Sequence, residues 1–292
     1  MLNNCYTEIT KKLSKLKVKT NYNISACTRY KTGGSADLYI EPNSIEELLF
    51  SLDTLKGVCP YYFIGGGNNL LVSDKGVRGA VISTKNLTNV EIKGNLYIAE
   101  CGASLSKVIE DMRLNSLSGL EFTVGIPATV GGAVTMNAGC YGKSVGDLVC
   151  YVLTDNGIIK KSDSNFSYRN SVFKEQNLAV LKVCFSLKPS EIDVIEEKLL
   201  QYKGFRKNPK GKNCGSVFKN DGYFAGKVID ECNLKGFKIG GARVSSEHAN
   251  FIIADDTATS KDIYDLIKTI KEKVFEKKQI KLIEEICYLG DF

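Results

Sequence analysis

The chain has 292 residues, of which 43% are hydrophobic and 25% are charged, and these values exclude a disordered or fibrous protein. Lysine and arginine outnumber aspartate and glutamate by 39 to 33, a net charge of +6 that is too small and too scattered to indicate a nucleic-acid-binding protein. The length predicts two or three domains, with one large domain as the alternative.

The first half of the chain alternates between helix and strand patterns. Ser44 and Glu47 form the signature of a capping box before a helix over 45–56. Apolar residues spaced by three, one and three predict a second helix over 104–115. Short apolar runs predict strands over 61–64, 80–84 and 96–100.

The second half begins with a hairpin signal, Asp155-Asn156-Gly157, between β-rich flanks over 150–160. A charged helix over 191–203 is followed by a basic stretch over 205–213 that is typical of a linker. Further patterns predict helices over 225–232 and 260–278, and strands over 242–245 and 251–254. We therefore expect a main domain over 1–195, made of subdomains over about 1–80 and 81–195, and a second domain over 196–292.

The ten cysteines lie at least ten residues apart, so the chain has no CxxC pair. This spacing argues against zinc, iron–sulfur and disulfide sites, and it predicts reduced thiols in the cytoplasm. The first twenty residues contain no apolar stretch of a secretory signal. Residues 122–142 carry no formal charge, but five glycines and Pro127 argue against a membrane span.

Three glycine-rich stretches, over 32–36, 65–70 and 125–133, could bind an anion. None has the spacing of a Rossmann turn or of a P-loop. Glycines let main-chain N–H groups approach one anion, so two such loops together could clamp a diphosphate. Ordinary tight turns remain the alternative for each loop taken alone.

The inventory of catalytic residues is small. His248 is the only histidine, so a histidine-rich metal site is impossible and we expect no metal. Its setting beside a predicted strand is more typical of a structural hydrogen bond than of catalysis. The polar segment Cys214–Asn220, taken alone, is typical of a surface loop.

Six segments in chain order carry a family resemblance. They are TRYKTGGSADLYIEP, FIGGGNNLLV, GLEFTVGIPATVGGAVTMNAGCYG, SYRNSVFK, CGSVFKNDGYFAGKVID and SSEHANFII. In this order they resemble the motifs of the UDP-N-acetylenolpyruvoylglucosamine reductases, over about residues 28–290. The resemblance implies an α+β protein: an FAD-binding fold of the vanillyl-alcohol-oxidase (PCMH) type in two subdomains, and a C-terminal α/β substrate domain whose last strand packs back toward the active site. The chain is similar to the shorter, second type of the family.

The resemblance also implies site residues. Non-covalent FAD would lie against two segments, through Gly65, Gly66, Gly67, Asn68, Asn69, Leu70, Ile126, Pro127, Ala128, Thr129, Gly131, Gly132, Ala133 and Asn137. The implied catalytic residues are Arg169, Ser216 and Glu285. Tyr168, Gly215 and Asn220 match positions of the substrate site. Superposing Gly290 on the family's terminal glycine selects Glu285 over its neighbour Glu284.

The family's reaction reduces UDP-N-acetylglucosamine enolpyruvate to UDP-N-acetylmuramate with NADPH, a cytoplasmic step of peptidoglycan synthesis. The flavin N5 would deliver hydride to the enol ether, leaving negative charge next to the substrate carboxylate. Arg169 suits pairing with that carboxylate, and Glu285 could donate a hydrogen bond to it only if protonated. Ser216 would protonate the carbanionic carbon, with help expected from water or a neighbouring cation. Lys212, Lys219 and Lys227 are candidates for the diphosphate of the nucleotide sugar.

The chain departs from the family's pattern at several positions. Ala128 replaces a usual glycine, which would cost about 1–2 kcal/mol if the residue needed positive φ. Cys140 replaces the usual alanine, no proline follows Asn220, and Cys287 stands where arginine is usual. The last departure puts the orientation of Glu285 in doubt.

Two alternatives remain. One is a flavin oxidase of the same superfold, which often tethers FAD through a histidine, although His248 is far in sequence from the glycine loops. The other is a non-catalytic nucleotide- or RNA-binding module, which the lack of an RNP-like aromatic motif disfavours. We expect a monomer whose partners are the nucleotide sugar and NADPH, with no nucleic acid and no membrane.

Overall fold

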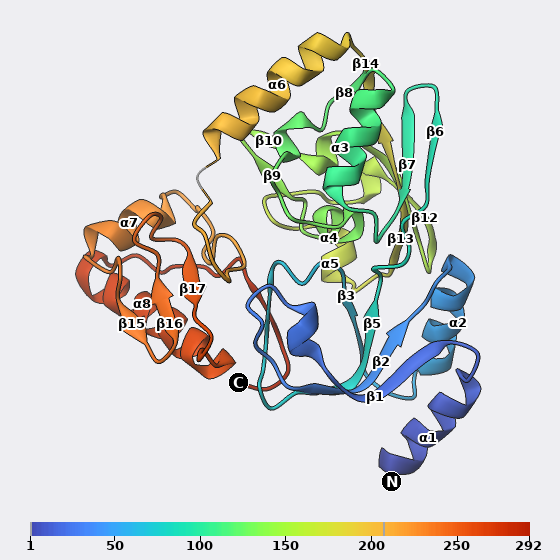
Figure 1. Cartoon of the computed structure of the whole chain (residues 1–292), viewed down its shortest axis with the longest axis horizontal. Helices are drawn as coiled ribbons and strands as arrows, with labels where there is room; N and C mark the ends of the chain where they lie inside the picture. The colour runs from blue at the N-terminus through green and yellow to red at the C-terminus, as the bar shows by residue number, and fades with distance from the viewer. Residues whose placement is uncertain (1, 207) are drawn as a thin grey trace.

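The computed structural model describes residues 2–206 and 208–292, which form three units around separate sheets (Figure 1). The first unit holds a four-stranded sheet in the order β1-β2-β5-β3. Its strands are β1 (Lys17–Asn23), β2 (Ser35–Glu41), β3 (Tyr61–Ile64) and β5 (Val77–Ser83), and its helices are α1 (Leu2–Lys12), η1 (Ile24–Cys27) and α2 (Ile45–Leu55). Strands β2, β5 and β3 run parallel, and β1 is antiparallel to β2.

Alternation of apolar residues gives this sheet two buried faces. Leu38 and Ile40 of β2 pack with α1 and α2, whereas Tyr39 between them packs with Val81 and Leu289 on the opposite face. Helix α2 begins where the sequence predicted, with Ser44 Oγ accepting from the Glu47 N–H. The capping box is only half formed, because the Glu47 carboxylate accepts from the Asn43 N–H instead.

The second unit holds an antiparallel five-stranded sheet in the order β12-β11-β13-β7-β6. Its strands are β6 (Val90–Lys93), β7 (Leu96–Glu100), β11 (Val149–Thr154), β12 (Gly157–Lys160) and β13 (Val180–Ser186). Around it lie α3 (Leu105–Leu114), η2 (Glu121–Thr123), α4 (Val130–Thr135), η3 (Val145–Asp147), η4 (Lys161–Asp163), α5 (Val172–Glu175), α6 (Ile192–Phe205) and the two-stranded pairs β8 (Leu117–Ser118) with β14 (Lys188–Pro189) and β9 (Gly139–Cys140) with β10 (Lys143–Ser144). The predicted hairpin is confirmed, with Gly157 at φ +104°.

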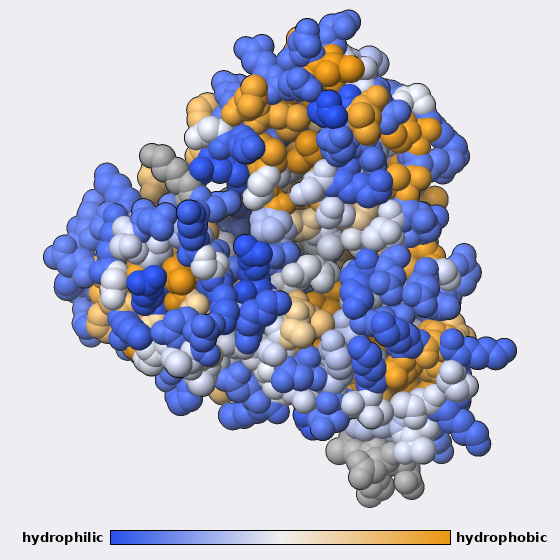
Figure 2. Space-filling view, viewed as in Figure 1, coloured by the Kyte–Doolittle hydropathy of each residue, from blue (hydrophilic) through white to orange (hydrophobic). Residues whose placement is uncertain are grey.

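The third unit packs two helices on a small antiparallel sheet in the order β15-β16-β17. The strands are β15 (Lys238–Ile239), β16 (Ala242–Val244) and β17 (Ile252–Ala254), and the helices are α7 (Ala225–Glu231) and α8 (Ser260–Lys278). Helix α8 matches its predicted bounds and buries the predicted apolar face. On the face drawn in Figure 2, hydrophilic side chains gather over this unit.

The last strand, β18 (Cys287–Leu289), leaves the third unit and pairs in parallel with β4 (Leu70–Val72) of the first. Figure 1 shows this red segment running between the two units. The boundary expected near residue 195 falls inside α6, and Lys207 of the expected linker lies outside the described residues. The uncharged stretch over 122–142 contains no long helix, and no described helix is long and apolar enough to cross a membrane.

Candidate active site

The glycine loop between β3 and β4 presents a row of unpaired donors. Within residues 2–206 and 208–292, no acceptor is found for the main-chain N–H groups of residues 65 to 69. Gly67 has φ +62°, and a Cβ there would collide with the Cys27 carbonyl. The loop therefore has the main-chain donors that an anion requires, and side chains at its glycines would disturb it.

The second glycine-rich segment lies against the first but has few unpaired donors. Thr129 caps α4 by accepting from the Gly132 N–H, and it fills the space where a Cβ on Gly65 would project. The N–H groups of Val130 and Gly131 are used by carbonyls at the end of β7. Those of Ile126, Ala128 and Ala133 also donate within the protein, and Pro127 has none. The free main-chain donors are therefore concentrated in the first loop.

Asn137 connects this segment to the turn that carries Arg169. Its Nδ2 donates to the Ser167 carbonyl at 2.9 Å, and its Oδ1 accepts from the Gly146 N–H at 3.0 Å. Both ends of the amide are thus hydrogen-bonded within the protein, although the family resemblance assigned Asn137 to the cofactor site. Its contacts support a structural role for the side chain, which holds the turn in place.

Arg169 and Glu285 meet across the unit boundary. Arg169 lies at the tip of the turn with φ +56°, and its Nε donates to Glu285 Oε1 at 2.5 Å. The two side chains are only 19% and 14% exposed. Burial raises the pKa of the Glu285 carboxyl above its ordinary value, and the Arg169 guanidinium offsets only part of this rise.

Glu285 also contacts the other two predicted segments. Its N–H donates to the Val217 carbonyl at 2.8 Å, which places it beside Ser216. Its own carbonyl accepts from Asn69 Nδ2 at 3.0 Å. The neighbouring Glu284 instead pairs with Lys271 on α8, at 2.8 Å. Stretches of chain that are far apart in sequence therefore converge on Glu285.

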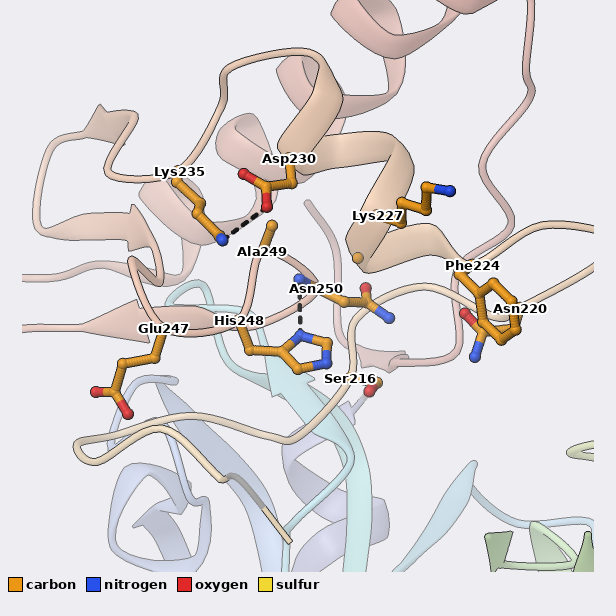
Figure 3. Close-up of a pocket in the computed structure, with 11 residues that line it drawn as sticks. Ser216, Asn220, Phe224, Lys227, Asp230, Lys235, Glu247, His248, Ala249 and Asn250 are labelled. Atoms are coloured by element: carbon orange, nitrogen blue, oxygen red, sulfur yellow. Dashed lines mark hydrogen bonds and ion pairs between the residues drawn. The ribbon is translucent and has the colours of Figure 1, made fainter. Parts of the chain in front are cut away.

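A cavity of about 330 Å³ opens beside Ser216 (Figure 3). Asn220 accepts from the Ala225 N–H at the start of α7, and its own N–H donates to the Tyr168 hydroxyl at 3.2 Å. Gly215 has φ +77° and introduces the sharp bend before Ser216. The cavity is lined by Ser216, Asn220, Phe224, Gly226, Lys227, Asp230, Lys235, Glu247, His248, Ala249 and Asn250.

Comparison with known proteins assigns both halves of the chain. Residues 36–161 match the family model of an FAD binding domain, and residues 207–289 match that of the UDP-N-acetylenolpyruvoylglucosamine reductase C-terminal domain. The reductase of Caldanaerobacter subterraneus is 39% identical over 94% of each chain, and that of Clostridium novyi is 39% identical over 96% of this chain and 94% of its own. The chain belongs to the UDP-N-acetylenolpyruvoylglucosamine reductase family.

The reductase fold is confirmed by a solved relative. The crystal structure of UDP-N-acetylenolpyruvylglucosamine reductase (MurB) from Thermus caldophilus matches with a TM-score of 0.82, at 31% identity, over 94% of this chain and 99% of that one. The expected α+β fold, with its vanillyl-alcohol-oxidase-type FAD-binding part and its separate C-terminal domain, is therefore correct.

The glycine loop of this reductase-family chain fits a flavin dinucleotide. Its row of N–H groups suits a diphosphate, because main-chain donors bind anions without bringing a mobile charge. A Cβ on Gly66 would collide with Asn68 Nδ2, so the glycine keeps the asparagine close to the row. The structure thus supports FAD as the cofactor of the family fold.

The departures from the reductase pattern have local explanations. Ala128 is not among the residues with positive φ, so alanine causes no strain there. Cys140 donates to the Phe122 carbonyl at 3.0 Å and accepts from Arg206 Nη2. Cys287 begins β18, two residues after Glu285, with its Sγ 3.9 Å from Asn69 Nδ2, and Glu285 nevertheless reaches Arg169.

Sequence reasoning placed some cavity residues and missed others. His248 accepts from the Asn250 N–H through Nδ1, the structural bond expected of it, and burial lowers its pKa. Lys227 lines the cavity, whereas Lys212 pairs with Asp256 at 2.6 Å. The exposed ring of Phe224 was missed, although its place four residues after Asn220 is a sequence signal that could have found it.

Proposed function

We propose that the chain reduces UDP-N-acetylglucosamine enolpyruvate to UDP-N-acetylmuramate, using NADPH and non-covalent FAD, in the cytoplasm and as a monomer. The single observation that supports this proposal most strongly is the convergence on Glu285 of Arg169, the Ser216 loop and Asn69. We also propose the division into an FAD-binding domain over 1–195 and a substrate domain over 196–292.

FAD, once reduced by NADPH, would supply the hydride for the enol ether. The main-chain N–H groups of residues 65 to 69 would hold its diphosphate, and Leu70 begins the strand that fixes the loop. Thr129, with Gly131 and Gly132 behind it, would close the other side of the dinucleotide site. The chain's part is to bind and orient both reactants.

Arg169 would bind the substrate carboxylate through its guanidinium. A guanidinium pairs with a carboxylate through two hydrogen bonds, so Arg169 would stabilise the negative charge that develops beside that carboxylate. Glu285 is suited to donate a hydrogen bond, because burial raises its pKa and favours the neutral form. A protonated Glu285 would also release Arg169 from their ion pair, which frees the guanidinium for the substrate.

Ser216 would give its hydroxyl proton to the carbanionic carbon. Ser216 lines the cavity directly after the bend at Gly215, and the next residue, Val217, accepts from the Glu285 N–H, which supports this role. A serine hydroxyl is a weak acid, so the strongly basic carbon supplies the driving force. Asn220, which lines the cavity, and Tyr168, which accepts from the Asn220 N–H, would bind the sugar, and Lys227 in the cavity lining would lie near the diphosphate.

An anaerobic mixing experiment tests the proposed function. NADPH should bleach the flavin absorption, and the nucleotide-sugar enol ether should then restore it with formation of a product two hydrogens heavier. Flavin absorption that returns only with oxygen would contradict the proposal and support the alternative of a flavin oxidase. Flavin that stays with acid-precipitated protein would contradict non-covalent binding.

A Ser216→Ala variant tests the proton donor. Bleaching by NADPH should be unchanged, while recolouring by the enol ether should slow by about 10²-fold or more. A matched control is Ser162→Ala, whose hydroxyl lies in an exposed turn of the second unit. Equal recolouring rates for Ser216→Ala and the unmodified chain would exclude Ser216 as the donor.

A further inference from the structure

Glu285 lies where the C-terminal segment changes partners. Before it, the segment runs antiparallel to the Ser216 loop: the Lys219 N–H donates to the Ile283 carbonyl, and Phe218 bridges to Glu284. After it, β18 runs parallel to β4, and the Cys287 N–H donates to the Asn69 carbonyl at 2.9 Å. Among the described residues, neither ladder provides a main-chain donor for the Glu285 carbonyl at this change.

The side chain of Asn69 fills that gap. Its Nδ2 donates to the Glu285 carbonyl at 3.0 Å, while its main-chain carbonyl accepts from Cys287. A covered carbonyl without a donor costs free energy, so a side chain that supplies the missing bond fixes the local backbone. Asn69 therefore holds the segment at two points, the Glu285 carbonyl and the Cys287 N–H.

The same residue belongs to the glycine loop. The main-chain N–H of Asn69 is the last of the unpaired row, one residue before β4. Its side chain is turned to Glu285, so only its main chain is available to a bound diphosphate. This distinguishes it from Asn68, whose amide lies over Gly66 within the loop.

We infer that Asn69 is a positioning residue for Glu285, and that its side-chain amide couples the geometry of the dinucleotide loop to that of the carboxyl group. The inference rests on the proposed function for its kinetic consequences. The structural part, that the Asn69 amide holds the backbone at Glu285, does not depend on the proposed function. Asn69 thus acts through Glu285, and its amide does not touch the reacting atoms.

Hydrogen exchange of the ligand-free chain tests the structural part. In Asn69→Ala the amides of Glu285 and Cys287 should exchange about five- to tenfold faster, the factor expected for one net hydrogen bond. Asn69→Asp keeps the shape, lacks the donor and should give the same direction of change, so a folding defect of the alanine variant does not decide the test. Unchanged exchange in either folded variant overturns the inference.

A matched control is Asn86→Ala. Asn86 also spans a long sequence separation through its amide, donating to Asn43 Oδ1 at 3.0 Å, but it lies on the exposed surface of the first unit. Its loss should leave exchange of residues 285 and 287 unchanged. Faster exchange in this control would show a general loosening and overturn the assignment to Asn69.

A double-mutant cycle tests the kinetic part. Asn69→Ala should slow recolouring by the enol ether about tenfold more than it slows bleaching by NADPH. In a Glu285→Gln background the same substitution should have less than about a twofold effect, because the residue it positions is already inactive. Additive losses, or equal losses in both half-reactions, overturn the inference. If the unmodified chain fails to recolour, the proposed function fails, while the exchange experiment still tests Asn69.

Discussion

Two glutamates with little exposed side-chain surface, in different regions of the molecule, have pKa values shifted in opposite directions. Glu41, at the end of β2, has a fully covered side chain, and Glu285 is only 14% exposed. Burial alone would raise both pKa values. At Glu41 the hydrogen bonds from Lys17 and Lys85 outweigh burial and lower the pKa to about 2, whereas at Glu285 burial prevails over Arg169.

The difference lies in the number and hydration of the partners. Lys17 and Lys85 are about half exposed, so they keep water around their charges while both bind Glu41. Arg169 is itself largely covered and is the only ion-pair partner of Glu285 among the residues described. A carboxylate is thus stabilised where cations reach it from solvent, and a neutral carboxyl is favoured in the closed space of the candidate site.

The largest expected effect comes from Glu285→Gln. This substitution should slow reduction of the enol ether by about 10²- to 10⁴-fold, because a protonated carboxyl at this place is a stronger hydrogen-bond donor than an amide. Bleaching by NADPH should remain close to normal in stopped-flow traces. Glu284→Gln is the matched control, since its carboxylate pairs with Lys271 away from the site, and it should recolour normally. Equal losses in the two variants would remove the contrast between the neighbouring residues.

Glu41→Gln should affect stability and leave the reaction unchanged. Loss of the carboxylate removes both lysine bonds from a covered position, so the free energy of unfolding should fall by about 1–3 kcal/mol. Urea titration followed by circular dichroism measures this change. A matched control is Glu91→Gln, whose pair with Lys93 is mostly exposed and should give no measurable change. A loss of turnover per folded molecule in Glu41→Gln would contradict the separation of the two regions.

Much of the fold was predictable because its signals are local. Helix α8 has an apolar face with helical spacing, and the turn at Gly157 joins strands that are adjacent in sequence. The pairing of β18 with β4 was not predictable from the residues, because both strands have only three residues and are more than 200 residues apart. Family resemblance alone indicated that the last strand returns to the site.

The candidate site was likewise predictable from the sequence only in part. Glycine spacing indicated the loop over 65–70. It could not show that the second segment donates its N–H groups within the protein, in part to carbonyls of residues 101 and 103 that follow β7. The partners of Asn137 and Asn69 depend equally on tertiary structure. The family resemblance therefore assigned both asparagines to the cofactor site, although their side-chain contacts differ.

The contributions of Glu41 and Glu285 to the free energy of unfolding should change in opposite directions with pH. The folded-state pKa of Glu41 is lowered, so its contribution is present above about pH 4.5 and is lost as the pH falls toward about 2. The pKa of Glu285 is raised, so its contribution is complete below the unfolded value of about 4.5 and is lost as the pH rises through the folded value.

Urea titrations of the unmodified chain and the two glutamine variants across this range test the sign. The stability difference for Glu41→Gln should shrink by about 2 kcal/mol between pH 5 and 3. The stability difference for Glu285→Gln should instead decrease as the pH rises from about 4. Curves that bend the same way for both variants would show that burial does not separate the two carboxyl groups as described.

Salt should produce the smallest effect, and it distinguishes the partners of the two glutamates. The charges of Lys17 and Lys85 are about half exposed, so raising sodium chloride from about 0.05 to 0.5 M should reduce the stability difference between the unmodified chain and Glu41→Gln by about 0.5 kcal/mol. The difference for Glu285→Gln should change less, because Arg169 and Glu285 are covered and mobile ions approach them poorly. An equal salt response at both sites would show that solvent reaches the Arg169–Glu285 pair, and the physical reason given for the raised pKa of Glu285 would then fail.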